Sequence, residues 1–172
     1  MSDDVHHIHL DADIEESPRE YMKLAGVIGG ILLLTIFLAW ARGFELERFM
    51  SDFMAVFFIT FACFKLFNID EFVAAYRGYD IIAKRLRPWA YAIPFVEGAL
   101  GLFYLLLNDS TLLNVVTMLI TGVGAYGVWQ ELKNKSNIMC ACLGTIIKLP
   151  LSKVSLVEDV GMFLMATVML II

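Results

Sequence analysis

The chain alternates between five long apolar stretches and shorter polar connections. Each stretch approaches the length of about 17–25 residues that an α-helix needs to cross the hydrocarbon core of a bilayer. The pattern predicts spans near residues 24–41, 49–67, 89–107, 112–129 and 155–172. Lipid offers backbone groups no hydrogen-bond partners, and the two-residue alternation of barrel strands is absent from these stretches. We therefore expect an all-α integral membrane bundle with about five transmembrane helices.

Two local signals predict where the first and last helices begin. Ser17-Pro18-Arg19-Glu20 matches a capping box with proline at the first helical position. Ser155-Leu156-Val157-Glu158 matches a second box, which would place the Glu158 carboxylate at a helix N-terminus, where the helix dipole stabilises negative charge. Residues 1–16 are acidic and contain histidines, so we expect a disordered cytoplasmic tail followed by a single transmembrane domain over residues 17–172.

The connection between the second and third predicted spans, residues 68–88, carries a helical pattern of its own. Its apolar residues recur at helical spacing, with charged residues between them: Ile69, Phe72, Val73, Tyr76, Ile82 and Leu86. This pattern predicts an amphipathic helix that lies in the membrane interface and ends at Pro88. Trp89 and Tyr91 would then begin the third span at the depth of the lipid head groups.

Composition supports the membrane class, since 59% of the residues are apolar, against roughly 45–50% in soluble domains. The mean hydropathy is +0.73. The net charge of -5 comes largely from the first twenty residues. Nucleic-acid binding needs a clustered cationic face, so the charge argues against such a partner. We expect the lipid bilayer and other membrane proteins as partners instead.

The distribution of Lys and Arg predicts the orientation of the spans. The N-terminal tail and the 68–88 and 130–153 connections together hold ten of these residues, whereas the opposite side holds only Arg42 and Arg48. The positive-inside rule then puts the N-terminus in the cytoplasm and the C-terminus outside, in a bacterial inner membrane.

The cysteine pair Cys140 and Cys142 is the first candidate for chemistry. Two close thiols can hold a soft ion such as Cu(I), or cycle between a dithiol and a strained disulfide. Zinc normally takes four ligands, so a zinc site would need further groups. His6, His7 and His9 lie on the same predicted side and could supply them, and Cys63 is a weaker candidate. The opposing interpretation is that free cysteines are packed as small apolar residues.

Lys65, Glu97 and Asp159 are singled out among the ionisable residues of the predicted spans, where charge is costly and is a functional candidate by default. Lys65 and Glu97 are on the same leaflet side, so an ion pair facing the bundle interior is feasible. Asp159, one turn into the last span, could accept a proton from a thiol or bind a cation. Lys65 and Glu97 could equally hold helices together, with Lys65 also able to reach the interface. Met162, Met165 and Met169 share one helix face, which favours packing over copper binding.

Two segments carry a family resemblance: Phe64–Leu106 and Cys140–Ala166. Their signatures are Lys65, Pro94-Phe95-Val96-Glu97-Gly98 and Cys140-Ala141-Cys142-Leu143-Gly144. The chain resembles the DoxX/MauE-like redox-associated membrane proteins. This resemblance implies a compact bundle, usually of four spans, and an association with thiol redox or heavy-metal handling. For the MauE members, the resemblance implies a role in the maturation of a disulfide-rich periplasmic enzyme. The first span and the acidic tail lie outside it.

Three functions remain open on the sequence. The first is thiol redox or soft-metal handling by Cys140 and Cys142 at the inner membrane face, with Lys65, Glu97 and Asp159 as an intramembrane polar network and Cu(I) or Zn as candidate metals. The second is a non-catalytic accessory subunit of a larger membrane assembly, such as a respiratory complex. The third is a heavy-metal transporter with the histidine tail as receiver. No complete catalytic constellation or nucleotide-binding loop accompanies them.

Overall fold

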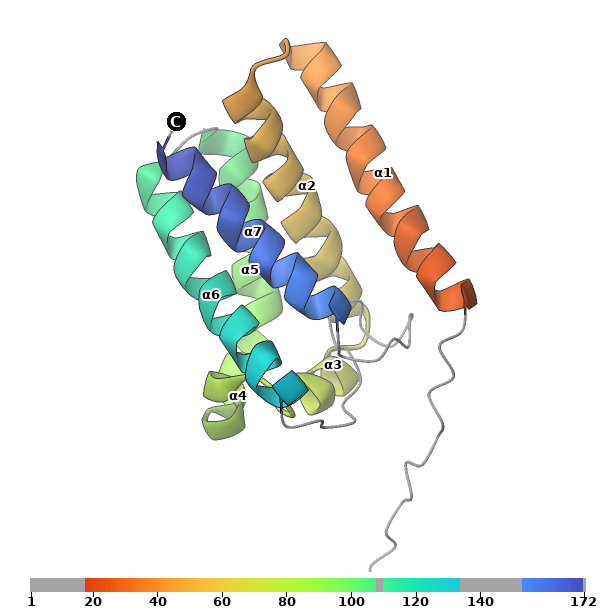
Figure 1. The fold of residues 1–172 in the computed structure, drawn as a ribbon, viewed down its shortest axis with the longest axis vertical. Coiled ribbons are helices and arrows are strands. Elements are labelled where there is room, and N and C mark those ends of the chain that lie inside the picture. The colour runs from red at the N-terminus through yellow and green to blue at the C-terminus, as the bar shows by residue number, and fades with distance from the viewer. Residues whose placement is uncertain (1–17, 108–109, 134–152, 172) are drawn as a thin grey trace, which may run out of the picture.

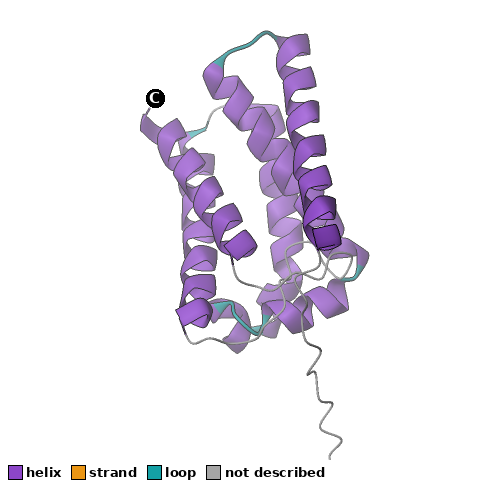
Figure 2. Ribbon diagram, turned by 45° about the vertical axis from the view of Figure 1, so that its right-hand side comes forward, coloured by secondary structure: helices purple, strands orange, loops and turns teal. Residues whose placement is uncertain are grey.

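The computed structural model describes residues 18–107, 110–133 and 153–171, and in these residues it contains helices and turns but no β-strand (Figures 1 and 2). The long helices are α1 (Pro18–Arg42), α2 (Leu46–Phe67), α5 (Arg87–Leu107), α6 (Thr111–Lys133) and α7 (Lys153–Ile171). Two short helices, α3 (Ile69–Tyr76) and α4 (Ile81–Arg85), join α2 to α5. The predicted all-α class is confirmed.

Membrane-spanning length and hydropathy are found in α1, α2, α5 and α6 within the described part of the chain. The predicted spans near residues 24–41, 49–67, 89–107 and 112–129 each correspond to one of these helices. The last predicted span corresponds to α7 in position, and α7 is not among the four helices that have spanning length and hydropathy within the described residues. The count of five spans therefore stays a prediction.

Helix starts agree with the first capping box and disagree with the second. α1 begins at Pro18, as the box at residues 17–20 predicts. α7 begins at Lys153, two residues before Ser155, so the prediction that Ser155 caps this helix is wrong. Lys153 and Val154 are both compatible with helical backbone, and the nearest residue before them that opposes a helix interior is Pro150.

The long helices associate as two pairs. α2 packs along α5, α6 packs along α7, and α1 lies at one edge, mainly against α2 (Figure 1). Gly101 makes the α2–α5 contact possible, because a Cβ atom there would lie 2.8 Å from Ile59 Cγ1 and 2.9 Å from the Ala55 carbonyl oxygen. The two pairs contact each other less extensively than the helices within each pair do. We call the boundary between them the seam, with α2 and α5 on one side and α6 and α7 on the other.

The predicted amphipathic helix over residues 68–88 is two helices rather than one. The chain breaks at residues 77–80, where the Asp80 carboxylate accepts a hydrogen bond of 2.7 Å from the Ala83 amide and so caps α4. Phe72, Val73 and Tyr76 are buried as the pattern predicts, but Leu86 is 58% exposed. Pro88 lies in the first turn of α5 instead of ending the preceding helix, a position that proline tolerates because the amide it lacks has no helical partner there.

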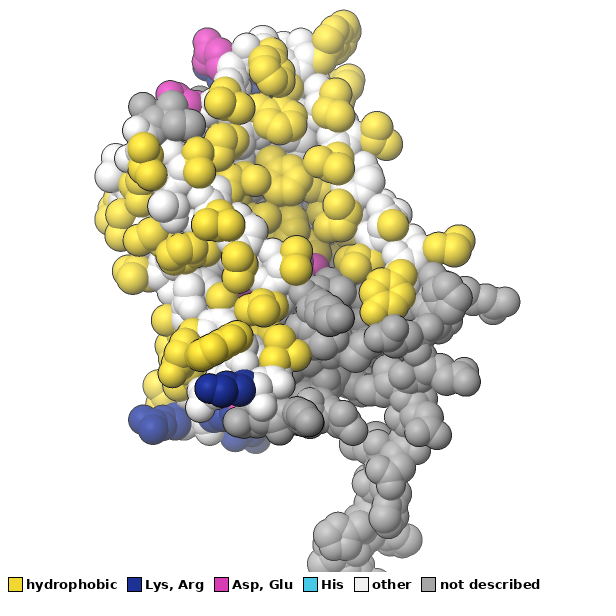
Figure 3. All heavy atoms as spheres, viewed as in Figure 1, with side chains coloured by type: hydrophobic (Ala, Val, Ile, Leu, Met, Phe, Trp, Pro, Cys, Tyr) yellow, Lys and Arg dark blue, Asp and Glu magenta, His cyan; other side chains and the backbone are white. Residues whose placement is uncertain are grey.

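Positive charge gathers at one end of the bundle, which we call the basic end. Lys and Arg side chains cluster where α4 and the end of α6 lie, while acidic side chains mark the opposite end near the α1–α2 turn (Figure 3). α2 and α6 end toward the basic end, and α5 and α7 begin toward it (Figure 1). All four helices of the seam therefore contribute a terminus to the same end.

Candidate functional site

Lys65 and Glu97 form a buried ion pair across the α2–α5 contact. The Lys65 ammonium lies 2.5 Å from Glu97 Oε1 and 2.6 Å from Oε2, and the two side chains are only 10% and 14% exposed. The ammonium also lies 5.5 Å from the centre of the Phe72 ring, a cation–π distance. In such surroundings each charge depends strongly on its partner, because neither is stabilised by bulk water.

Aromatic rings from α2 lie in the same part of the bundle as this pair. Phe57 and Phe61, one turn apart, stack with their ring centres 4.2 Å apart, and Phe58 meets Phe57 edge to face. All three are buried. The phenylalanine-rich sequence of α2 thus gives Lys65 an apolar surround and leaves its ammonium facing the seam.

A small cavity of about 50 Å³ opens beside the ion pair, between the two helix pairs. A buried water needs at least about 10–15 Å³, so this volume holds a few water molecules. Pockets for drug-sized ligands have volumes of about 300–1,000 Å³, so this cavity is much smaller than a pocket of that kind. Its polar or ionisable lining residues come from every helix of the seam and from the α3–α4 region: Lys65, Tyr76, Tyr79, Glu97, Thr121, Glu158 and Asp159.

The α6–α7 pair supplies the second half of this site. Asp159 lies against Gly124 of α6, where an added Cβ would be 3.1 Å from Asp159 Oδ2. Glycine at this position therefore makes room for the carboxylate. The structure brings Lys65, Glu97 and Asp159 to one cavity, and adds Glu158, for which the sequence suggested only a helix-capping role. We call this group of residues the charged cavity.

The α3–α4 region closes the charged cavity toward the basic end. Tyr76 and Tyr79 both line it and pack edge to face with ring centres 5.3 Å apart. Burial raises the pKa of the Tyr76 hydroxyl well above its usual value, and the carboxylates of Asp80 and Glu97 raise it further. Tyr76 is therefore a neutral hydrogen-bonding group. Gly127 lets this turn approach α6, because a Cβ there would lie 2.9 Å from the Tyr79 carbonyl oxygen.

Charge balance decides what the cavity can do. Among the described lining residues, one ammonium, Lys65, lies with three carboxyl groups, and charge is costly inside a lipid-embedded bundle. Several groups that can carry a proton therefore lie together around one small cavity. An arrangement of this kind can take up and release protons next to a few water molecules.

The other predicted site residues lie elsewhere. Cys140, Cys142, His6, His7 and His9 are outside the described residues. Cys63 is exposed and does not line the cavity. Among the described residues, no group of three or more His, Cys, Asp or Glu side chains is arranged to hold a metal ion. Met162 and Met169 belong to the buried apolar core, in agreement with packing.

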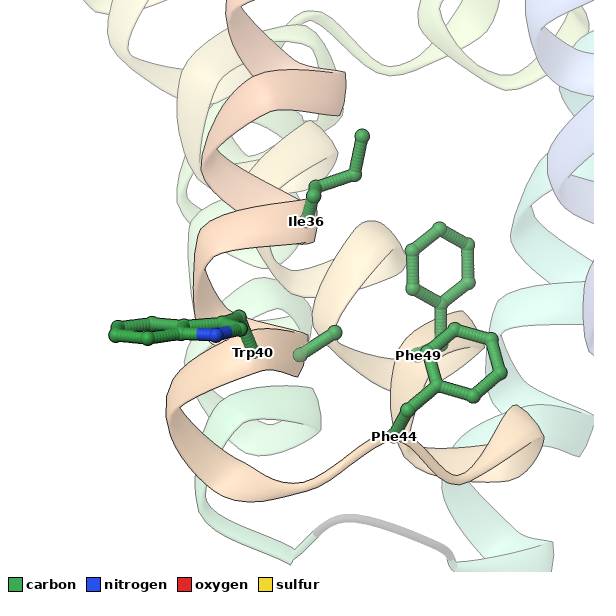
Figure 4. Close-up of a pocket in the computed structure, with 5 residues that line it drawn as sticks. Ile36, Trp40, Phe44 and Phe49 are labelled. Carbon is green, nitrogen blue, oxygen red and sulfur yellow. The ribbon is translucent and has the colours of Figure 1, made fainter.

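A second, apolar pocket lies between the end of α1 and the start of α2. Its volume is about 310 Å³, and Ile36, Ala39, Trp40, Phe44 and Phe49 line it without an ionisable side chain (Figure 4). The Phe44 and Phe49 rings lie side by side there, with centres 5.7 Å apart. This pocket offers no group for chemistry.

A buried ion pair between α1 and α2 was not anticipated from the sequence. Arg42 donates a hydrogen bond of 2.9 Å to Asp52 Oδ1, and Asp52 is fully buried. The signal was present, because Asp52 is an acid seven residues into an apolar helix and follows two arginines. The count of Lys and Arg that predicts the orientation of the spans treats Arg42 and Arg48 only as charges that flank the spans.

Taken as a class, this is a multi-pass helical membrane protein with an ionisable cavity between two helix pairs. The family model described as "Methylamine utilisation protein MauE" matches residues 44–172, which is most of the chain. The chain therefore belongs to the MauE family, a MauE/DoxX-like membrane family, as the sequence resemblance predicted. Helix α1 lies almost entirely before the matched region. No curated protein and no solved structure matches the chain.

Proposed function

We propose that this protein carries out thiol–disulfide exchange through Cys140 and Cys142, and that the charged cavity handles the protons of that reaction. The observation that carries the proposal is the placement of the cavity on the seam, where residues of α6 and α7 line it. In the sequence, Cys140 and Cys142 lie in the segment between these two helices. The membership of the chain in the MauE family supports it.

The reaction balances with a partner protein that offers a disulfide. The two thiols of this chain lose two electrons and two protons and form a disulfide, while the partner's disulfide takes up the electrons and the protons to become a dithiol. Thiolate is the attacking form, so a nearby proton acceptor speeds the exchange. Asp159 and Glu97 are the carboxylates we assign to that role.

We place the basic end on the cytoplasmic side of a bacterial inner membrane, with the N-terminus inside and the C-terminus outside. The gathering of Lys and Arg at this end supports the orientation (Figure 3). In the cytoplasm the pair would rest as a dithiol, ready to reduce a disulfide.

Replacing both Cys140 and Cys142 by serine tests the proposal. The variant should lose the ability to reduce a model disulfide after prior reduction with dithiothreitol, measured by mass-tagging of thiols on the purified full chain in detergent. Cys63→Ser is the matched control, because Cys63 is exposed and away from the cavity, and it should keep full activity. Equal activity of the double-serine variant and Cys63→Ser would refute thiol exchange.

The metal content of the purified protein distinguishes metal handling by the same cysteines from thiol–disulfide exchange. If the pair holds Cu(I) or Zn instead, the purified protein should contain about one metal ion per chain, lost in the double-serine variant. Removal of residues 1–16 tests His6, His7 and His9, and unchanged metal content would remove them from the site.

An accessory-subunit role has one specific observation in its favour. Gly26 and Gly30 on α1 have no neighbouring atom within 4 Å of an added Cβ, so this small-residue face is open within the described chain. Open glycine faces of this kind allow another membrane helix to approach closely. Gly26→Leu should release a co-purifying subunit, whereas Leu32→Ala, exposed on another face of the same helix, should not.

A further inference from the structure

Polar side chains continue from the charged cavity toward the opposite end of the bundle. Asn114, Thr117 and Thr121 lie on one face of α6 and are 0%, 0% and 5% exposed. Gly124, against which Asp159 packs, continues this face. We call these four positions the polar stripe. It begins in the first turn of α6 and reaches the cavity, because Thr121 lines it.

Hydrogen bonds connect the stripe to α5. The Tyr104 hydroxyl donates to Asn114 Oδ1 at 2.9 Å and lies 3.1 Å from Thr117 Oγ1. The Thr121 hydroxyl donates to the Thr117 carbonyl oxygen at 2.8 Å. Tyr104 itself is fully buried. A row of hydroxyl groups thus lies across the seam between the cavity and the end of the bundle opposite the basic end.

The length of the stripe suits a connection through the membrane. From Asn114 to Gly124 the helix rises about 15 Å, which is half of a hydrocarbon core of about 30 Å. The stripe reaches the charged cavity at Thr121 and Gly124, which both line it. Hydroxyl and amide groups in membrane helices gain significance when helix packing brings them together, as it does for Asn114, Thr117 and Tyr104.

We propose that the polar stripe of α6 and the Tyr104 hydroxyl give protons a route between the charged cavity and the end of the bundle opposite the basic end. Protons pass along the hydroxyl groups and the water in the cavity, and are held at the cavity by Asp159, Glu158 and the Lys65–Glu97 pair. This proposal does not rest on the thiol chemistry, because it concerns only how protons reach the carboxylates.

A flux measurement on the purified full chain in lipid vesicles tests the route. A pH-sensitive dye is trapped inside, and a potassium gradient with valinomycin draws protons inward. Wild-type vesicles should acidify several-fold faster than protein-free vesicles. Thr121→Val and Tyr104→Phe should both bring the rate down toward the protein-free value, since each removes a hydroxyl from the route.

Two further variants separate a proton route from simple helix packing. Thr121→Ser restores the hydroxyl and should restore the flux. Thr35→Val is the matched control, because Thr35 is equally buried and donates to a carbonyl of its own helix in the same way, but lies on α1 away from the stripe. It should leave the flux at the wild-type rate. A wild-type rate equal to that of empty vesicles, or equal rates for Thr121→Val and Thr35→Val, would overturn the proposal.

Discussion

Two buried carboxylates are paired with cations at different depths of the bundle, and their surroundings differ. Asp52 is held by Arg42, whose side chain is 36% exposed and reaches the outside of the helices. Glu97 is held by Lys65, and both side chains are almost enclosed. Asp52 joins α1 to α2 and lines neither pocket, whereas Glu97 joins α2 to α5 at a cavity shared with Asp159 and Glu158.

The contrast shows which feature of a buried charge points to chemistry. The Arg42–Asp52 pair matches one cation to one anion, and its main effect is to fix α1 against the bundle. The charged cavity brings Lys65, Glu97, Glu158 and Asp159 together among the described residues and also has room for water. Several ionisable groups around one small cavity, rather than burial alone, separate the candidate site from a structural ion pair.

The largest effect on stability should come from breaking the enclosed pair. Glu97→Leu leaves the Lys65 ammonium buried without its carboxylate, and loss of one partner of a buried pair costs about 3–5 kcal/mol. Denaturant unfolding in detergent should show a destabilisation in this range. The double variant Lys65→Met/Glu97→Leu should recover most of the loss, because no unpaired charge remains. A double variant as unstable as Glu97→Leu would contradict this account.

A smaller loss of stability is expected at the Arg42–Asp52 pair, whose arginine is partly exposed. Arg42→Ala leaves the buried Asp52 carboxylate without its donor, which costs about 1–3 kcal/mol. The loss stays below that at Glu97 because the Arg42 side chain is 36% exposed, so it already exchanges part of its interaction with water. Arg48→Ala is the control: Arg48 pairs with the exposed Glu45, and such surface pairs contribute about 0–1 kcal/mol. If Arg42→Ala proves more costly than Glu97→Leu, the contrast between the two pairs fails.

The smallest effect on stability, with a clear effect on function, is expected at Gly124. An added methyl group there meets Asp159 Oδ2 at 3.1 Å, so Gly124→Ala shifts the carboxylate by a few tenths of an ångström. Unfolding should change by less than about 1 kcal/mol, because alanine is the better helix former. Proton flux should nevertheless fall. Gly161→Ala on α7 has open space at the same point and should change neither property appreciably.

Hydrophobic pattern was enough to predict most of the fold. Long apolar runs and the Pro18 start signal depend on local sequence, and the helices follow them closely. The break at residues 77–80 was missed because it is fixed by tertiary contacts, namely the Asp80 cap and the approach of this turn to Gly127. The Ser155 cap failed because a capping pattern does not prevent a helix from starting earlier.

The site was predictable only in its charged members. Lys65, Glu97 and Asp159 stand out because charges are rare in apolar stretches, and sequence placed the first two on one side of the membrane. Thr121, Tyr104 and Asn114 were not singled out, since hydroxyl and amide groups are common in membrane helices and gain significance only when helices bring them together. Gly124 likewise acquires meaning only through its contact with Asp159.

If the carboxylates of the charged cavity accept protons from the cysteine pair, thiol–disulfide exchange depends on them. The rate of that exchange tests this dependence most directly. The rate should be measured at neutral pH for Asp159→Asn and for Asp52→Asn, the same chemical change at the two regions. A positioned proton acceptor contributes about 10²–10⁴-fold, so we predict that Asp159→Asn slows exchange by at least an order of magnitude while Asp52→Asn leaves it near the wild-type rate. Equal rates in the two variants would contradict the account.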